Sequence, residues 1–321
     1  MRILTGIQPS GKLHWGNYFG AMKPIIDMQD KGETFVFVAQ YHALTTVHDA
    51  EALRQATRDV ALDFLACGLD PAKACLFRQA DIPELHELAW LLSTVTPMGL
   101  LERCHSYKDK LARGIAASHG LFAYPVLMAA DILAYQSDLV PVGRDQKQHV
   151  EVTRDIAAKF NQAFGTEVFR LPEPLIAEAV AVIPGLDGQK MSKSYNNTIG
   201  LFDDPKDVKA KIMRIATDST PLESPKDPDA CRVFALYKLF ANDQELEEMR
   251  ANYLRGGYGY GHAKKALFEI YQRTLGPFRE RRERLASHPD ELEDILRAGA
   301  QRARAAALET LAAARRAVGL D

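Results

Sequence analysis

Short apolar runs alternate with helix-length patterns along the first 200 residues, and this alternation constrains the fold more than any other feature. The strand-like runs are residues 2–6 (RILTG), 35–39 (FVFVA), 74–78 (ACLFR) and 138–142 (DLVPV). Helical apolar spacing is found in residues 16–30, 51–67, 83–94, 99–113, 122–135 and 146–164. Such alternation predicts an α/β fold with a doubly wound parallel sheet that carries helices on both faces.

The strand signals stop after the segment DDPKDVKAKI, and residues 205–321 show helical patterns only. The last of these helices, rich in Ala, Arg, Glu and Leu, is expected from about Glu291 to Ala317. The sequence therefore predicts a Rossmann-like nucleotide-binding domain over residues 1–200 and a helical domain over residues 201–321. This division leaves open that the C-terminal helices pack back on the first domain.

The N-terminal segment and the cysteines limit the class of protein. Gly6, Gln8 and Pro9 interrupt the first apolar run too early for a signal peptide, and no stretch reaches the ~18 apolar residues of a membrane span. We therefore expect a cytoplasmic protein. The cysteines lack C-x-x-C spacing, so we expect buried thiols, with neither a disulfide framework nor a protein-bound metal.

The basic residues are concentrated near the C-terminus. Residues 251–321 contain 13 Lys and Arg against 9 Asp and Glu, a net charge of +4, whereas the whole chain has −2. The densest run, RERRER at residues 279–284, alternates Arg with Glu on a predicted helix. Such a run is typical of a solvated helix face, although a basic region also suits contacts with nucleic acid.

The loop after the first strand is where a ligand is expected, because open parallel sheets bind ligands outside the carboxyl ends of their strands. Here the sequence reads IQPSGKLHWGNYFGA, with a small-residue turn at residues 9–11. Gly16 and Asn17 open a helix whose N–H groups and dipole suit a phosphate. His14 precedes this helix, where it serves either as a structural cap or as a group that reaches the phosphate.

Two segments together carry a family resemblance. Residues 9–17 (PSGKLHWGN) resemble the first signature, His-Ile-Gly-His, of the class I aminoacyl-tRNA synthetases. Residues 190–194 (KMSKS), within GLDGQKMSKSYNN, match their second signature letter for letter, about 175 residues later. Trp15 replaces the Ile, and Asn17 replaces the second His. Asn17 can donate a hydrogen bond but carries no charge, so more of the transition-state charge would fall to the lysines and magnesium.

The resemblance implies which residues bind ATP and assist the reaction. Lys190 and Lys193, on a mobile loop, would neutralise the departing pyrophosphate. The implied catalytic residues are His14, Asn17, Lys110, Lys190 and Lys193. The implied ATP-binding residues are Gln8, Pro9, Ser10, Gly16, Asn17, Gly143, Arg144, Asp145, Val182, Ile183, Lys190, Met191, Ser192, Lys193 and Ser194. For Lys110, an exposed helix lysine without this role is an equal alternative.

Residues 124–138 and 140–155 make the chain most similar to the tryptophan-specific members of the family. Tyr124, Met128 and Asp131 lie at i, i+4 and i+7 and share one otherwise apolar helix face. A carboxylate there needs a partner, and the indole N–H is a donor only, although a salt bridge inside the core is an alternative. The resemblance implies that Tyr124 and Gln146 hold the α-amino group. The implied walls of the indole pocket are Met128, Val140, Val142, His42 and Leu4.

The implied reaction joins tryptophan to its tRNA in two steps. The tryptophan carboxylate attacks the α-phosphate of Mg·ATP, and a terminal ribose hydroxyl of the tRNA then attacks the acyl adenylate. The resemblance also implies a homodimer and an anticodon-binding surface on the basic C-terminal helices. A tyrosine-specific relative, another nucleotidylyltransferase and a non-catalytic RNA-binding paralogue are the alternatives. The segment LMAAD argues against the tyrosine-specific relative, and the helical basic region argues against another nucleotidylyltransferase. The intact KMSKS argues against the non-catalytic paralogue.

Overall fold

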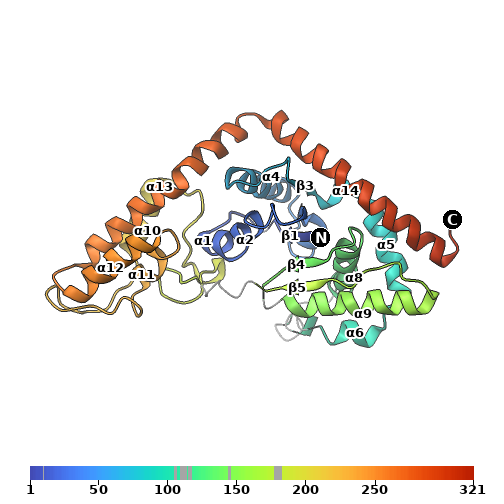
Figure 1. Cartoon of the computed structure of the whole chain (residues 1–321), viewed down its shortest axis with the longest axis horizontal. Helices are drawn as coiled ribbons and strands as arrows, with labels where there is room; N and C mark the ends of the chain where they lie inside the picture. The colour runs from blue at the N-terminus through green and yellow to red at the C-terminus, as the bar shows by residue number, and fades with distance from the viewer. Residues whose placement is uncertain (10, 105–106, 109–113, 115–117, 144–145, 177–182) are drawn as a thin grey trace. The chain divides into compact units, whose positions relative to one another are not determined.

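The core of the fold is a sheet whose described strands are all parallel. The computed structural model describes residues 1–9, 11–104, 107–108, 114, 118–143, 146–176 and 183–321. The strands are β1 (Arg2–Ile7), β2 (Glu33–Val38), β3 (Ala74–Arg78), β4 (Leu139–Pro141) and β5 (Glu173–Leu175). The strands lie in the order β3-β2-β1-β4-β5, so the chain adds β2 and β3 on one side of β1 and then adds β4 and β5 on the other side (Figure 1). This doubly wound order confirms the predicted α/β fold. The short β5 was not predicted.

The helices follow the predicted pattern in most places. Those of the first 176 residues are α1 (Trp15–Asn17), α2 (Lys23–Ile26), α3 (Gln40–Ala43), α4 (Ala50–Ala66), α5 (Glu84–Ser93), α6 (Met98–Glu102), α8 (His119–Leu133) and α9 (Lys147–Phe164). The described residues here also form a π-helical turn, η1 (Tyr18–Met22), and a 3₁₀ turn, η2 (Gln79–Asp81). The helix predicted over residues 99–113 ends at Glu102 in α6, and part of the remainder lies outside the described residues.

The remaining helices confirm that residues 205–321 contain no strand. They are α10 (Pro205–Met213), α11 (Arg232–Tyr237), α12 (Asp243–Arg255), α13 (Tyr260–Ala286) and α14 (Pro289–Val318), preceded by the 3₁₀ turn η4 (Lys193–Tyr195). The last helix agrees closely with the predicted one.

The chain forms two compact units, and their boundaries differ from the predicted division at residue 200. Unit 1 contains residues 1–11, 25–177 and 288–321, and unit 2 contains residues 12–24 and 178–287. The segment after β1 and the KMSKS segment therefore belong with the helices α10 to α13. The last helix belongs with the sheet, an arrangement that the sequence prediction leaves open for the C-terminal helices. Local apolar spacing could not reveal that residues 12–24 join unit 2, because membership of a unit depends on tertiary contacts.

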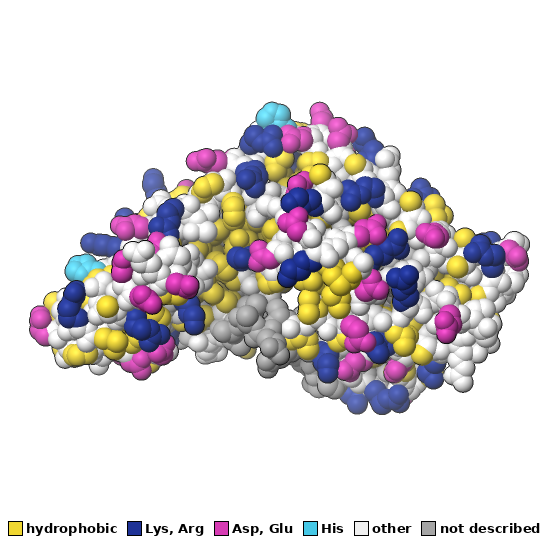
Figure 2. All heavy atoms as spheres, in the orientation of Figure 1, with side chains coloured by type: hydrophobic (Ala, Val, Ile, Leu, Met, Phe, Trp, Pro, Cys, Tyr) yellow, Lys and Arg dark blue, Asp and Glu magenta, His cyan; other side chains and the backbone are white. Residues whose placement is uncertain are grey.

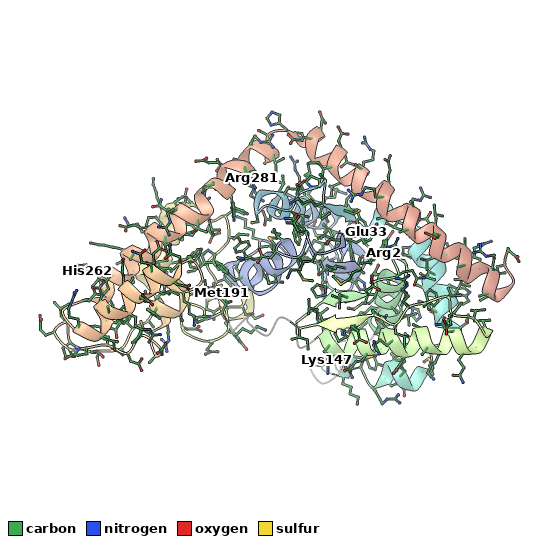
Figure 3. All side chains as sticks on the ribbon, in the orientation of Figure 1. Arg2, Glu33, Lys147, Met191, His262 and Arg281 are labelled. Atoms are coloured by element: carbon green, nitrogen blue, oxygen red, sulfur yellow. The ribbon has the colours of Figure 1, made fainter. Side chains whose placement is uncertain are left out.

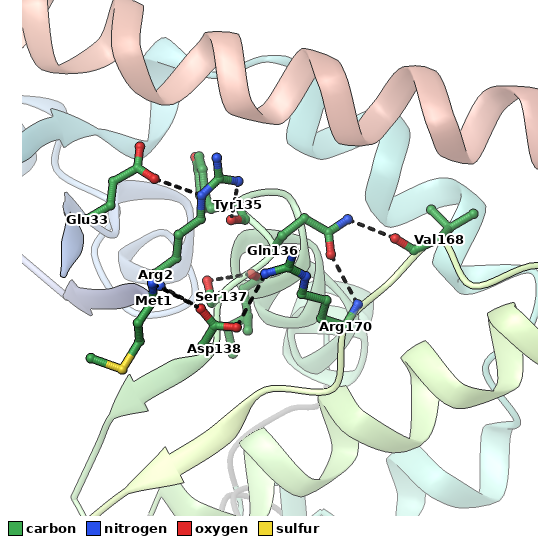
Figure 4. A network of polar contacts seen from close by, with 10 residues as sticks. Met1, Arg2, Glu33, Tyr135, Gln136, Ser137, Asp138, Val168 and Arg170 are labelled. Carbon is green, nitrogen blue, oxygen red and sulfur yellow. Dashed lines mark hydrogen bonds and ion pairs between the residues drawn. The ribbon is translucent and has the colours of Figure 1, made fainter.

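The amino ends of the strands in unit 1 are tied together by polar contacts (Figure 4). The backbone N–H of Arg2 donates to Asp138 Oδ2 at 2.6 Å, and Arg2 Nε donates to Glu33 Oε2 at 2.8 Å. Arg2 Nη1 donates to the carbonyl of Tyr135 at 3.1 Å, and Arg170 lies 3.5 Å from Asp138 Oδ1. These contacts join the starts of β1, β2 and β4, leaving the opposite, carboxyl ends of the strands for ligand binding.

The last helix, α14, covers the edge strand β3. Gly299 approaches the backbone so closely that an added Cβ would lie 2.0 Å from the carbonyl oxygen of Leu76. Arg78 at the end of β3 donates to both carboxylate oxygens of Glu293, at 2.9 and 2.7 Å. Further ion pairs of α14 with this unit include Arg304–Glu84 and Arg315–Glu87. The helix thus protects a strand edge that would otherwise be open to pairing with another chain.

Two findings bear on the expected class of protein. All four cysteines, which lie among the described residues, are buried thiols, as predicted. Within the described part of the chain, no helix combines the length and the apolar character required to cross a bilayer.

Gly299→Ala is expected to lower the free energy of unfolding by about 1 to 3 kcal/mol, because the new methyl group collides with the backbone of β3. Gly261→Ala is the matched control: Gly261 lies in α13 with no atom within 4 Å of its added Cβ. Because Ala favours a helix, the control should gain up to about 1 kcal/mol. Urea denaturation measures both. An equal gain in the two variants would contradict the close packing of α14 on β3.

Candidate active site

The predicted site residues are divided between the two units. Those expected to bind tryptophan lie in unit 1. Both signatures lie in unit 2, except that Pro9 and Gly11 at the start of the first signature lie in unit 1. Gln8 and Gly143, also expected to bind ATP, belong to unit 1. The predicted residues outside the described part of the chain are Ser10, Lys110, Arg144, Asp145 and Val182.

His14 and Asn17 form a reciprocal cap at the start of α1. His14 Nδ1 accepts a hydrogen bond from the backbone N–H of Asn17 at 3.3 Å, and Asn17 Oδ1 accepts from the N–H of His14 at 3.1 Å. His14 is therefore a structural cap, which is one of the two roles considered from the sequence. Because Nδ1 accepts, the neutral imidazole carries its proton on Nε2, where it can donate to a phosphate. The cap also leaves the side-chain nitrogen of Asn17 as a donor.

The two signatures meet inside unit 2. The N–H of Trp15 donates to the carbonyl of Ile199 at 3.0 Å, and His14 forms an antiparallel bridge with Gly200. The N–H of Gly16 contacts the sulfur of Met191 at 3.4 Å, and Figure 3 shows Met191 beside α1. Contacts within one unit thus join segments about 175 residues apart.

Charge and burial keep His14 neutral. Burial, followed by the positive charge of Lys193, lowers the pKa of His14 to about 4. Burial also lowers the pKa of Lys193 below its ordinary value. At neutral pH His14 can therefore offer a hydrogen bond but no charge. Positive charge from the two signatures must come from their lysines.

Trp15, the residue that replaces Ile in the first signature, anchors an aromatic cluster in unit 2. Its side chain is fully buried, and the centroid of its ring lies 4.9 Å from that of Phe240 and 5.4 Å from that of Tyr271. Phe240 precedes α12 and Tyr271 lies in α13, so the larger indole ring joins the first signature to both segments. The departure from the family pattern thus increases packing at this position.

Arg279, the first residue of the RERRER run, is part of the fold and not of a solvated face. It donates to the carbonyls of Phe202 at 3.1 Å and Asp203 at 2.6 Å, and to the hydroxyl of Tyr271 at 2.7 Å. Arg282 of the same run lies over the ring of Phe202 at 5.4 Å. This is a correction for these two positions, because the alternating pattern of Arg and Glu does not show which of them have neighbours inside the unit.

Asp131 lies at the centre of a buried polar cluster in unit 1. Only 1% of its surface is exposed. Gln79 Nε2 donates to both of its carboxylate oxygens, at 2.8 and 2.9 Å, and His42 Nε2 lies 2.7 Å from Oδ2. An ionised carboxylate only accepts, so the proton of His42 must be on Nε2. Asp131 therefore has partners inside the protein. A carboxylate has about four acceptor positions, so one remains for a substrate donor.

Gln79 is a candidate site residue that the sequence reasoning missed. It is fully buried, and its side-chain oxygen also accepts from the N–H of Tyr41 at 2.9 Å. Its position was a usable signal, since it is the first residue after the predicted strand at residues 74–78. It was missed because 52 residues separate it from Asp131 in the sequence.

The other predicted tryptophan-binding residues also lie in unit 1. Leu4 and Val140 are almost fully buried in the core, and Met128 and Val142 pack against it with part of their surface exposed. The Tyr124 hydroxyl lies 3.0 Å from His149 Nε2, and its ring is 6.1 Å from that of His42. Gln146 is the N-cap residue of α9. The structure thus brings Tyr124, His42 and Asp131 together.

Two further findings concern the predicted nucleotide contacts. The N–H of Met191 donates to the carbonyl of Ile183 at 2.8 Å, so an adenine contact through that N–H would have to share or replace this bond. Among the described residues, no group of three or more His, Cys, Asp or Glu side chains is placed to hold a metal ion.

Comparisons with known proteins agree with this arrangement. The model of the family "tRNA synthetases class I (W and Y)" matches residues 1–276. Proteins named tryptophan–tRNA ligase from Fusobacterium nucleatum and Rhodopirellula baltica are 54% and 56% identical to this chain, with 99% and 100% of it covered and 98% and 100% of their own lengths. A crystal structure of tryptophanyl-tRNA synthetase from Campylobacter jejuni, complexed with ADP and tryptophan, is 51% identical and covers both chains fully with a TM-score of 0.94.

The proton of His14 provides a test of the site in unit 2. Its pKa of about 4 lies below the value of 6.5 for an unperturbed histidine, so between these pH values the unfolded chain binds a proton that the folded chain does not. This contribution to stability is complete above pH 6.5 and is lost as the pH falls toward 4. A histidine NMR titration should place the His14 midpoint at about 4. A midpoint near 6.5 would contradict the burial and the influence of Lys193.

Proposed function

The chain belongs to the class I tRNA synthetases of the W and Y family, and we propose that it is the tryptophan-specific ligase of that family. It activates tryptophan with ATP to form tryptophanyl adenylate and pyrophosphate, and then transfers tryptophan to the 3′ end of its tRNA. The relatives named above, which are 54% and 56% identical to this chain over nearly its full length, support tryptophan over tyrosine as the substrate.

In the first step the tryptophan carboxylate attacks the α-phosphate in line, and the protein supplies positioning and charge stabilisation without a nucleophile of its own. We assign the neutral Nε2–H of His14 to a phosphate oxygen, and Lys190 and Lys193 to the departing pyrophosphate. Magnesium arrives with ATP as part of the substrate, and the phosphates supply ligands to it. The remaining nucleotide contacts predicted from the sequence belong to the same proposal.

The observation that carries the choice of substrate is the buried carboxylate of Asp131. Gln79 and His42 hold it in one orientation, and its remaining acceptor position matches the single donor of an indole ring. The partly exposed Met128 and Val142 lie against the same core and suit an apolar ring. Tyr124 and Gln146 are proposed to hold the α-amino group.

For the second step we propose that helices of unit 2 bind the anticodon part of the tRNA. The residues that support this are the exposed Arg281 and Arg284 of α13, of which Arg281 is labelled in Figure 3. Basic and acidic side chains are interspersed on the face of α13 that Figure 2 shows. Phosphate contacts would therefore come from individual arginines and not from a uniformly basic patch. ATP and tRNA as substrates also favour a cytoplasmic location.

We also propose that the protein is a homodimer that associates through α5 and α6. Trp90 on α5 and Met98 on α6 have 70% and 63% of their surface exposed, the highest values for large apolar side chains in the described part of the chain. Tryptophan and methionine are enriched where proteins contact each other.

Pyrophosphate exchange into ATP, assayed with each amino acid in turn, tests the assigned activity. Only tryptophan should support it, and equal exchange with tyrosine, or no exchange at all, would overturn the proposal. In the same assay Gln79→Leu should lower kcat/KM for tryptophan by about 10- to 100-fold, because Asp131 loses its orienting donor, while KM for ATP stays unchanged.

The control for this variant is Gln29→Leu. Gln29 also bonds through both ends of its amide, to the carbonyl of Gly68 at 3.2 Å and the N–H of Asp70 at 2.8 Å, but it has no part in the proposed site. The control should lose stability and keep its kcat/KM. If both variants lose tryptophan activity equally, Gln79 has only a structural role.

The proposed dimer surface is tested by Trp90→Glu, which places a charge where a partner chain would exclude water. Sedimentation equilibrium should show a shift from dimer to monomer. The dissociation constant of the dimer should rise at least about 100-fold, in the range measured for central interface residues. Leu254→Glu on α12 is the control, since Leu254 is also more than half exposed. A wild-type chain that is monomeric, or a Trp90 variant that stays dimeric, would refute this surface.

A further inference from the structure

The side chain of Asn197 is hydrogen-bonded to the backbone of the KMSKS segment. Only 2% of Asn197 is exposed, although the neighbouring residues 193–196 are exposed. Its Oδ1 accepts from the N–H of Ser192 at 2.8 Å. Its Nδ2 donates to the carbonyl of Lys190 at 3.1 Å and to Asp187 Oδ1 at 2.8 Å. The side chain therefore bonds the peptide groups on both sides of Met191.

The turn before the signature is shaped to receive this amide. An added Cβ at Gly185 would lie 2.3 Å from Asn197 Cγ, so only glycine leaves room for it. The backbone carbonyl of Asn197 accepts from the N–H of Leu186 at 3.0 Å. The hydrogen bond from Asn197 is also the main reason why the pKa of Asp187 lies below its usual value. The loop thus closes around one amide that uses both its acceptor and its donors.

We propose that Asn197 is the positioning residue of the adenylation step, which fixes the backbone between Lys190 and Lys193 so that their two charges meet the same leaving group. The inference rests on the proposed function of these lysines in expelling pyrophosphate. Lys190 is exposed, Lys193 is partly covered but keeps much of its surface in solvent, and both side chains have many rotamers. A fixed backbone reduces the entropy that is lost when they assemble around the phosphates, and the benefit is largest in the transition state.

The chemistry at residue 197 requires an amide. Aspartate has the same shape and still accepts from Ser192, but it replaces the donor with an acceptor that faces the Lys190 carbonyl and the Asp187 carboxylate. Both bonds are lost, and two negative charges come close together. Asn197→Asp therefore changes the hydrogen bonding of the loop while it leaves the packing nearly unchanged.

Single-turnover formation of the adenylate from ATP and tryptophan should be about 10- to 100-fold slower in Asn197→Asp. Tryptophan affinity, measured by equilibrium dialysis, and transfer from preformed adenylate to tRNA should remain within about twofold of the wild type. Asn196→Asp is the matched control, because it makes the same change at the next residue, which is exposed. It should behave as the wild type.

A second pair of variants separates positioning from loss of folding. Asp187→Ala alters an exposed residue, so it should fold normally and show a smaller loss in the same step. Asp187→Asn, added to Asn197→Asp, returns a donor opposite the new carboxylate and should recover part of the rate. Wild-type rates in both Asn197→Asp and Asp187→Ala, equal losses at residues 196 and 197, or slowing of both reaction steps would overturn the inference. A wild-type chain without tryptophan-dependent exchange would instead refute the proposed function.

Discussion

An open sheet edge can pair with another chain, and in this protein the edge at β3 is covered by the last helix of the polypeptide. β3 is an edge strand, and an uncovered edge presents unpaired N–H and C=O groups to any other strand. The last helix approaches β3 closely enough that only glycine fits at residue 299. Residues 178–287, by contrast, belong to the other unit. The helix that covers the edge strand β3 is therefore the last element of the sequence.

Local patterns predicted the elements better than the units. Apolar runs located β1 to β4, because a strand buried on both faces must be apolar along its length. They did not locate β5, which has only three residues and contains Pro174. Nor did they indicate that residues 12–24 leave the sheet unit, because the bonds from Trp15 to Ile199 and from Gly16 to Met191 cross about 175 residues.

The same limit applies to the candidate site. Helical spacing placed Tyr124, Met128 and Asp131 on one face, and Tyr124 and Asp131 do lie beside His42. Spacing along one helix could not indicate that Gln79 and His42, which come from other segments, form hydrogen bonds with the Asp131 carboxylate. For His14 the sequence left a cap and a phosphate contact as alternatives. The structure shows the cap through Nδ1, and because that role leaves the Nε2 proton available, the two roles are compatible.

The discontinuity of the two units has a consequence for how the chain is made. Synthesis proceeds from residue 1, so β3 leaves the ribosome long before residues 288–321 exist. During that interval the nascent sheet has an open edge, and the first signature lacks the segments of unit 2 that it will contact. Folding of either unit must wait for segments distant in the sequence, which is slow and exposes the chain to misassociation. Nascent chains halted before residue 288 should therefore depend most on chaperones.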